Sequence, residues 1–294
     1  MKYVIVIPAK NEESDIAKTL KSVAEQSIPP QKCIVVDDSS SDNTAAIIKQ
    51  FEEKYSFISY QFNTSKKDYQ LGGHVVQVFE YGLEILNKEN IDYDYAVKLD
   101  ADITFDPDFM QEIANRLTNR KYGIVSGTPY YMEDSKKISE ISPFWHTHGQ
   151  FKIYNRIFLE QIKFIPRSLG WDSADNIQAM SLNWETEAFR DVHYKMSRKI
   201  GGKSSLAKGR INHGIGAYLL GYGYFYMLLK ILHDMFKPPV LIGSFYLLKG
   251  FIKTHGKKRI LDKAQIMLLR KQLWKSFFER FKGGQFILFQ KIKK

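Results

Sequence analysis

The stretch Val97-Lys98-Leu99-Asp100-Ala101-Asp102-Ile103 places two carboxylates two residues apart, directly after a short apolar run. Alternation along an extended chain points Asp100 and Asp102 to the same side. Two neighbouring carboxylates repel each other unless a cation lies beside them, so this strand end can hold a hard divalent ion. Because Asp is also common in turns, the stretch is equally compatible with a strand that runs into an acidic loop.

Strands and helices alternate through the hundred residues that lead up to this stretch. Runs of β-branched residues predict buried strands at 3–7, 33–36, 57–60 and 95–99. Helical patterns follow at 12–26, 45–55 and 74–86, and Asn11 is a good N-cap for the first of them. This order predicts an α/β fold with a mostly parallel sheet that is covered on both faces.

Three polar loops, at 8–13, 37–44 and 100–106, follow predicted strands. In such sheets ligands bind beyond the carboxyl ends of the strands. The first strand is not followed by Gly-x-Gly-x-x-Gly, and the full P-loop pattern Gly-x-x-x-x-Gly-Lys-Ser/Thr is absent from the sequence, which disfavours a dinucleotide fold and a P-loop enzyme. Acids at strand ends instead suit a nucleotide held through its base, its ribose and a metal-bridged diphosphate.

Three sequence blocks, in this order and spacing, resemble the family 2 glycosyltransferases. They are IVIPAKNEE at 5–13, IVVDDSSSDNT at 34–44 and KLDAD at 98–102. The resemblance implies a GT-A nucleotide-sugar-binding domain, with a mixed, mostly parallel sheet flanked by helices, over residues 1–212. Ser39 departs from the family, which often has Gly after the paired aspartates.

The resemblance also implies roles for residues in these blocks. Asp102 would ligate Mg²⁺ or Mn²⁺ on the donor diphosphate. The remaining candidates would contact the donor nucleotide: Pro8, Ala9, Asn11, Glu12, Asp37, Asp38, Asp100 and Ala101.

An acceptor-side motif is suggested by Gly170-Trp171-Asp172-x-x-Asp175, which opens a predicted helix through residue 182. Local chemistry alone makes Asp172 an N-cap and places Asp175 in the first helical turn. The family likeness implies that Asp175, or failing that Asp172, is the general base that deprotonates an acceptor hydroxyl. Trp171 and Trp145 are candidates for binding the acceptor.

The stretch 128–148 is aromatic and includes His146 and His148. The pattern indicates either a loop packed on the sheet or a set of aromatic rings that stack on sugar.

Residues 184–191 predict an edge strand that continues into residues 192–195. The resemblance places His193 where related enzymes carry a third metal ligand or a diphosphate contact. His193 is thus either a second metal ligand or a structural histidine. The basic run that follows, 195–210, predicts either a lid over the phosphates or a solvated loop.

Charge is divided unevenly along the chain. Residues 1–194 contain 21 Lys and Arg and 29 acids (net −8), whereas residues 195–294 contain 22 and 3 (net +19), which together give the total of +11. This asymmetry indicates that the C-terminal part faces a polyanion or an anionic surface.

Two apolar stretches in this basic part, 214–229 and 240–248, are shorter than the ~20 residues of a membrane span and predict helices. A basic amphipathic helix is predicted over 261–281. We expect 213–294 to be a basic α-helical extension that attaches in plane to an anionic membrane. Packing on the sheet domain or on a second copy, as a homo-oligomer, is the alternative.

The single cysteine, Cys33, lies in an apolar run and excludes a disulfide framework or a cysteine metal cluster. Residues 1–7 are too short an apolar run for a secretory signal. The sequence therefore predicts a cytoplasmic protein, peripheral at the inner face of the membrane.

The leading interpretation is an inverting, metal-dependent hexosyltransferase that uses a UDP- or GDP-type sugar donor. Its acceptor would be a glycan or a lipid-linked hydroxyl, in polysaccharide, cell-surface glycan or glycolipid synthesis. The alternatives are a retaining transferase or nucleotidyltransferase on the same sheet, and a non-enzymatic module that binds membrane or polyanion. Acidic loops at three strand ends argue against a nucleic-acid partner.

Overall fold

The computed structural model describes residues 1–64, 72–118, 121–139, 142–162, 164–198, 205–235 and 241–282. The chain divides into two compact units. The first contains residues 1–167 and 178–199, and the second contains residues 168–177 and 200–294. Residues 200–212 thus fall in the second unit, whereas the sequence predicts a boundary at residue 212.

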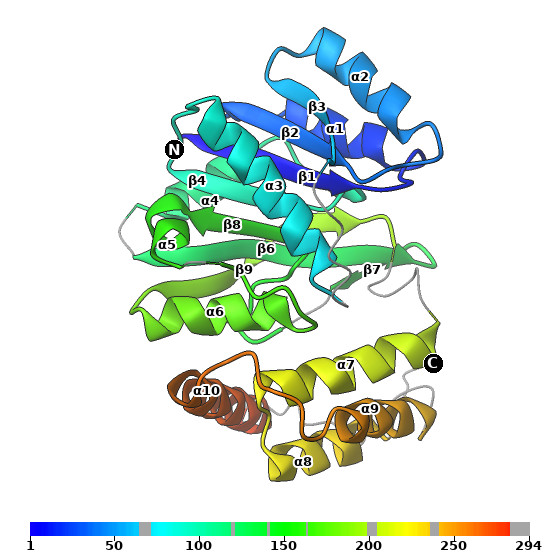
Figure 1. Cartoon of the computed structure of the whole chain (residues 1–294), viewed down its shortest axis with the longest axis vertical. Helices are drawn as coiled ribbons and strands as arrows, with labels where there is room; N and C mark the ends of the chain where they lie inside the picture. Colours follow the sequence, from blue (N-terminus) through cyan, green and yellow to red (C-terminus); the bar gives the residue numbers. More distant parts are fainter. Residues whose placement is uncertain are drawn as a thin grey trace. The chain divides into compact units, whose positions relative to one another are not determined.

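Four strands of the first unit form a parallel block in the order β3-β2-β1-β4 (Figure 1). They are β1 (Tyr3–Ala9), β2 (Lys32–Asp37), β3 (Ile58–Phe62) and β4 (Tyr95–Leu99). All four were predicted to within two residues, and β4 has the predicted bounds. Their β-branched runs are buried because helices cover both faces of the sheet.

The sheet continues with strands of mixed direction, in the order β4-β8-β6-β9-β5 with β7 paired to β6. They are β5 (Ile103–Phe105), β6 (Tyr122–Glu133), β7 (Lys136–Ser139), β8 (Phe151–Asn155) and β9 (Glu185–Met196). The GT-A type of α/β sheet expected from the resemblance is therefore confirmed.

Two sequence predictions in this part need correction. The first part of β9, Glu185–Ala188, pairs with β6 alone, but its last part, Tyr194–Met196, lies between β6 and β5, so the strand is not an edge strand over its whole length. Its buried Val192, Tyr194 and Met196 carry the apolar alternation to the end of the strand, one residue beyond the predicted continuation through Lys195. The stretch 128–148 is not one loop either, since β6 runs on to Glu133 and then pairs with β7.

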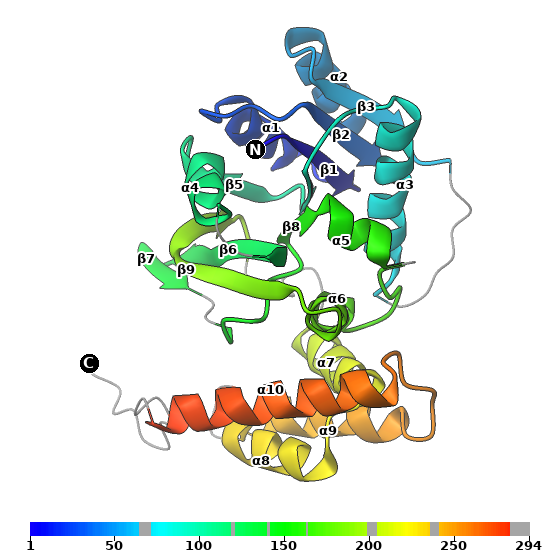
Figure 2. The ribbon, with the colours of Figure 1, turned by 90° about the vertical axis from the view of Figure 1, so that its left-hand side faces the viewer.

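Helices α1 (Ile16–Ala24), α2 (Thr44–Lys54), α3 (His74–Lys88), α4 (Phe109–Arg116) and α5 (Arg156–Gln161) complete the first unit. Figure 2 shows α3 and α5 on one face of the sheet and α1 and α4 on the other. Residues Ile16, Leu20 and Val23 of α1 join the core beside Ile5 and Ile7 of β1. On the opposite face, a Cβ at Gly82 of α3 would come within 2.4 Å of Val6.

The predicted N-cap role of Asn11 is wrong, because α1 begins five residues later at Ile16. Asn11 adopts a left-handed conformation with φ 54° and turns the chain toward the loop after β2. Its side-chain oxygen accepts a hydrogen bond from the Ser41 amide at 2.8 Å. The first loop is consequently fastened to the second loop, and not to its own helix.

The second unit is helical. It contains the start of α6 (Trp171–Ser181), then α7 (Leu206–Leu220), α8 (Tyr224–Asp234), α9 (Ile242–Lys253) and α10 (Lys263–Lys282). The predicted helix over 214–229 is in fact two helices, because Gly221 adopts φ 90° and ends α7. None of the helices within the described ranges has the length and apolar character needed to cross a bilayer.

Helices α7 and α9 approach so closely that only glycine fits at their contact. A Cβ at Gly214 would come within 2.1 Å of the Leu247 carbonyl oxygen, and one at Gly250 would come equally close to that of Ile211. The core beside this contact consists of Ala217, Tyr218, Met227, Leu247 and Phe251.

Candidate active site

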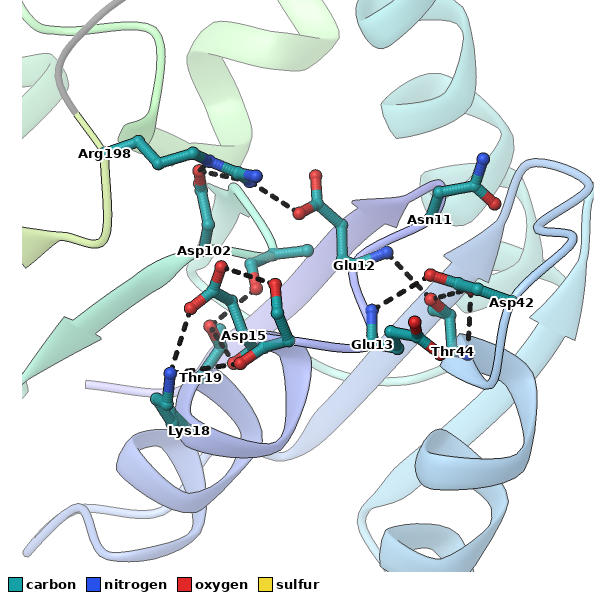
Figure 3. A network of polar contacts seen from close by, with 12 residues as sticks. Asn11, Glu12, Glu13, Asp15, Lys18, Thr19, Asp42, Thr44, Asp102 and Arg198 are labelled. Carbon is teal, nitrogen blue, oxygen red and sulfur yellow. Dashed lines mark hydrogen bonds and ion pairs between the residues drawn. The ribbon is translucent and has the colours of Figure 1, made fainter. Parts of the chain in front are cut away.

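The loops that follow β1 and β2 are joined by a ladder of hydrogen bonds (Figure 3). The amide of Glu12 donates to Thr44 Oγ1 at 2.8 Å, and the amide of Glu13 donates to Asp42 Oδ2 at 3.2 Å. Nearer the sheet, the Asp38 amide donates to the Ala9 carbonyl at 2.8 Å. Two segments about thirty residues apart are thereby held as one rim at the carboxyl ends of the strands. Of the other predicted donor contacts, Pro8 stands near the end of β1, opposite Val36 of β2.

Asp37 and Asp38, which end β2 and open this rim, are both buried. Asp37 accepts hydrogen bonds from the Ser40 amide at 2.9 Å and from the Tyr60 hydroxyl at 3.1 Å. Burial, together with Asp37, raises the pKa of Tyr60. The hydroxyl therefore stays protonated and fixes the orientation of the Asp37 carboxylate.

Asp38 has a different set of partners. Its carboxylate contacts His74 Nε2 at 2.6 Å and Asn63 Nδ2 at 2.8 Å, and Lys10 Nζ lies 3.4 Å away. Burial disfavours the charged form, but the bonds from His74 and Asn63 outweigh it, so the pKa of Asp38 is lowered. The carboxylate is thus kept ionised at the carboxyl end of β2, where the sequence predicts a nucleoside contact.

Asp100 directly follows β4 and forms an ion pair with Lys98. The Lys98 side chain is only 2% exposed, and its ammonium also donates to the Gly149 carbonyl at 2.6 Å. Burial raises the pKa of Asp100, and the negative charges of Asp102 and Glu12 raise it further against the effect of Lys98. Next along the chain, the Ala101 carbonyl accepts a hydrogen bond from Thr19 Oγ1 at 2.8 Å. Asp100 is therefore fixed through its side chain, and Ala101 is fixed through its carbonyl.

Asp102 meets Glu12 through a shared cation, the guanidinium of Arg198 (Figure 3). Arg198 Nη2 lies 2.6 Å from Glu12 Oε2 and 2.9 Å from Asp102 Oδ2. Although partial burial opposes its charge, the two carboxylates raise the pKa of Arg198 above its already high value. Three segments distant in sequence thus converge on one charged cluster.

His193 is not brought to this cluster. In β9 it is paired with Thr128, whereas Ser197 is the residue whose amide donates to the Asp102 carbonyl, at 3.0 Å. The separation of four positions between His193 and Ser197 corresponds to about 13 Å along an extended strand. The His193 ring instead lies against Tyr130, and burial and Lys137 lower its pKa.

Glu12 and Asp102 are suited to a divalent ion by the chemistry of their donor atoms. Both supply carboxylate oxygens, which Mg²⁺ and Mn²⁺ prefer, and both already hold a cation in the form of Arg198. Among the described residues no group of three or more His, Cys, Asp or Glu is placed to bind a metal. The remaining ligands would thus have to come from the donor phosphates and water.

The predicted acceptor-side residues are divided between the two units. Trp145, in the first, is partly buried, and its carbonyl accepts a hydrogen bond from Thr186 Oγ1 at 2.7 Å. Trp171, Asp172 and Asp175 lie in the second unit, on α6.

The helical roles predicted for the two aspartates are wrong, because α6 begins at Trp171. Asp172 is therefore inside the first turn and is not its cap, and Asp175 lies one turn further on. Asp175 is completely buried, and its Oδ1 accepts a hydrogen bond from the Asn176 amide at 2.7 Å.

Three residues of this site were not predicted in the roles they have. Asn63 and His74 hold Asp38, and no motif marks them, since each lies near an element boundary. Arg198 was predicted only as part of a basic run. Residues 199–204, the middle of the run predicted as a lid or a solvated loop, lie outside the described residues, whereas Lys195 lies in β9 and residues 206–210 open α7.

Comparison with solved structures places the sheet in the GT-A class of nucleotide-sugar transferases. The chain aligns over its full length with 95% of S. aureus TarS 1–349 in complex with UDP-GlcNAc, at 15% identity and a TM-score of 0.57. It also aligns over 96% of its length with 75% of the mannosyltransferase PcManGT from Pyrobaculum calidifontis, in complex with GDP-Man and Mn²⁺, at 15% identity and a TM-score of 0.54.

The family model "Glycosyl transferase family 2" matches residues 4–172. The chain belongs to this family and is a glycosyltransferase. It is 29% identical over 195 residues to poly-beta-1,6-N-acetyl-D-glucosamine synthase from Staphylococcus epidermidis. That match covers 61% of this chain and 44% of the relative, so the chain spans less than half of the relative's length.

Proposed function

We propose that the chain transfers a hexose from a nucleoside-diphosphate donor to a hydroxyl acceptor, with inversion at the anomeric carbon, in polysaccharide or related surface-glycan synthesis. The observation that carries this proposal is the convergence of Glu12, Asp38, Asp100 and Asp102 at the carboxyl ends of parallel strands. The pathway is supported by the polysaccharide synthase among its relatives. The donor class is supported by the UDP-GlcNAc and GDP-Man complexes of its structural neighbours.

On the donor side, the chain supplies acceptors for hydrogen bonds. Asp38 is kept ionised by His74 and Asn63, so it can accept a bond from a nucleobase N–H or a ribose hydroxyl. Asp100 lies next along the rim and is held by Lys98. Pro8, Ala9, Asn11 and Ala101 would shape the pocket mainly through the backbone.

Asp102, with Glu12 beside it, would hold a Mg²⁺ or Mn²⁺ ion. When bound, such an ion would neutralise the charge that develops on the departing nucleoside diphosphate. Arg198 now holds both carboxylates, so it must release Asp102 for the ion to bind there. Once released, its guanidinium is free to pair with phosphate oxygens.

The general base is proposed to be Asp175, with Asp172 as the alternative. A base must reach the acceptor hydroxyl within hydrogen-bond distance. Because the Asp175 side chain is 0% exposed, this role requires the acceptor site to open onto it. Asp172 is partly exposed and could serve without that opening.

A thermal-shift panel of UDP, GDP, CDP and TDP, each with and without Mn²⁺, tests the donor site. We expect one diphosphate to raise the melting temperature, and only with metal. Asp102→Asn should remove the metal-dependent part of the shift, with Asp191→Asn, a surface carboxylate, as the control. If no diphosphate produces a shift, the nucleotide pocket is not where we place it.

The chemistry is tested separately. Asp175→Asn should retain the nucleotide-dependent shift and lose transfer, and a near-normal rate would move the role to Asp172. NMR of the product's anomeric configuration decides the stereochemistry. Retention would overturn the single-displacement mechanism while leaving the donor site intact.

A further inference from the structure

Two short helices of the second unit expose continuous apolar faces. On α8, Phe225, Leu228 and Leu232 are 65%, 52% and 46% exposed. On α9, Ile242, Phe245 and Ile252 are 54%, 64% and 60% exposed. Their spacing of three, four and seven residues keeps each set on one side of its helix.

These faces are not the ones with which α8 and α9 pack on each other, although the Phe225 ring also stacks on Trp274 of α10, with ring centroids 6.0 Å apart. Met227 of α8 and Leu247 and Phe251 of α9 turn inward and are buried. The two helices contact each other through the rings of Tyr224 and Phe251, 5.7 Å apart, and through a bond from Ser244 Oγ to the Ile231 carbonyl. Each helix therefore has a buried apolar side and a second, exposed apolar side. Large exposed apolar areas of this kind mark interaction surfaces.

Positive charge lies on the exposed face of α9, in a unit that is basic as a whole. Lys249 lies between Phe245 and Ile252 on the same side of α9, and it is exposed, as is Lys253. Residues 205–235 and 241–282 together contain 14 Lys and Arg and 3 acids, a net charge of +11. One of these acids, Asp234, is buried and pairs with Arg210 and Lys230, so its charge is compensated locally by these two cations.

The charge decides between two occupants of an apolar surface. A second copy of the chain would bring the same positive charge against itself, which opposes association. An anionic bilayer offers acyl chains for the apolar side chains and headgroup phosphates for the lysines. Helices of 11 and 12 residues have the length of elements that lie in the interface, not of spans.

We propose that the α8–α9 face, defined by Phe225, Leu228, Leu232, Ile242, Phe245, Lys249, Ile252 and Lys253, docks on an anionic lipid bilayer. The aromatic and aliphatic side chains enter the boundary between headgroups and acyl chains. Lys249 and Lys253 pair with lipid phosphates. The proposal does not depend on which sugar or nucleotide the first unit uses.

Sedimentation of the full chain with vesicles tests the proposal. We expect the wild type to sediment with phosphatidylcholine vesicles that contain phosphatidylglycerol, and much less with phosphatidylcholine alone. The double variant Phe245→Ser/Ile252→Ser should lower the partition coefficient at least ~10-fold, because two inserted side chains are lost. Ile157→Ser/Phe164→Ser, which removes equally exposed apolar groups from the first unit, should bind like the wild type.

A charge variant and a mass measurement complete the test. The variant Lys249→Glu/Lys253→Glu should lose the part of its binding that depends on anionic lipid, and its remaining binding should depend less on salt concentration.

Equal sedimentation of the wild type and the serine variant would overturn the proposal. So would a wild-type dimer in light scattering that the serine variant converts to monomer without any vesicle binding, because the occupant would then be a second copy. All variants change exposed side chains, and unchanged nucleotide-dependent melting would show that the first unit is intact.

Discussion

Arg198 and Asp102 form a two-point ion pair, in which Nε and Nη2 of the guanidinium lie 3.1 and 2.9 Å from the same carboxylate oxygen. The pairing of β9 with β5 brings these residues together across 96 positions of sequence. Because Glu12 shares the guanidinium, Arg198 neutralises two carboxylates that would otherwise repel each other. A divalent ion would do the same, so ion and arginine should compete.

Replacement of Arg198 by alanine should therefore make the stability of the protein depend on a divalent metal ion. Without metal we expect the free energy of unfolding to fall by about 1–3 kcal/mol, because two partly buried carboxylates lose their cation. Mn²⁺ should restore much of this loss, and it should stabilise the variant more than the wild type. Urea unfolding with and without Mn²⁺ measures both effects, with Arg116→Ala as a control at a surface ion pair. Equal stabilisation of variant and wild type by Mn²⁺ would contradict the competition.

Loss of the His74 ring should lower stability near neutral pH and make it depend less on pH in the acid range. The bonds from His74 and Asn63 lower the pKa of Asp38 below its unfolded value of about 3.9. A carboxyl group with a lowered pKa contributes stability above the unfolded pKa, and that contribution is lost as pH falls through the folded pKa.

In His74→Ala the pKa of Asp38 should move back toward its unfolded value, so the stability advantage of the wild type should be largest near pH 7 and should shrink as pH falls below about 4, where the two profiles converge. The loss at pH 7 should be about 1–2 kcal/mol. Unfolding midpoints measured from pH 3 to 7 test this, with the exposed His255→Ala as the control. Parallel pH profiles would mean that the His74 bond does not control Asp38.

Lys98 and Lys2 allow a buried and an exposed ion pair to be compared. Lys98→Met should lower the free energy of unfolding by about 2–3 kcal/mol, because Asp100 and the Gly149 carbonyl both lose a charged donor. Lys2→Met removes a pair with Asp92 that lies in solvent, and it should change stability little. Chemical denaturation measures the free energy of unfolding of both variants. Equal losses of this free energy in Lys98→Met and Lys2→Met would contradict the prediction.

Two glycines of α7 should respond in opposite directions to alanine. At Gly214 a Cβ would come within 2.1 Å of a backbone oxygen of α9, so Gly214→Ala should cost about 1–3 kcal/mol. At Gly216 the nearest atom would be 3.5 Å away, so Gly216→Ala should be neutral or gain up to about 1 kcal/mol of helix propensity. Thermal unfolding followed at the helical signal separates the two outcomes, and the same sign for both would contradict the close contact of α7 with α9.

The parallel half of the sheet could be predicted because its strands are short apolar runs with a polar loop after each. The acids of these loops could be predicted as a group for the same reason. Asp37 and Asp38 come at the end of the second predicted strand, and Asp100 follows the fourth, so a parallel arrangement of these strands brings them to one rim.

The partners of these acids could not be predicted in this way. Arg198 reaches Asp102 only because the end of β9 pairs with β5 as well as with β6. An alternating apolar pattern predicts a strand, but it does not predict with which strands that strand pairs. His193 was chosen for its chemistry, but the register of β9 places it four residues from the position beside Asp102. Asn11 was taken as a helix cap since Asn serves both caps and left-handed turns, and only the contact with Ser41 decides between them.

The position of β9 also bears on how the chain folds during synthesis. In the described sheet, β5 pairs with β9, although the two strands are some eighty residues apart in sequence. As the chain emerges from the ribosome, the strands of the parallel block and β8 can associate early, but β5 has to wait for β9. Asp102 is thus anchored only when Arg198 arrives a few residues later. We therefore expect the edge of the sheet that carries Asp102, the proposed metal ligand, to be among the last parts of the nascent sheet to form.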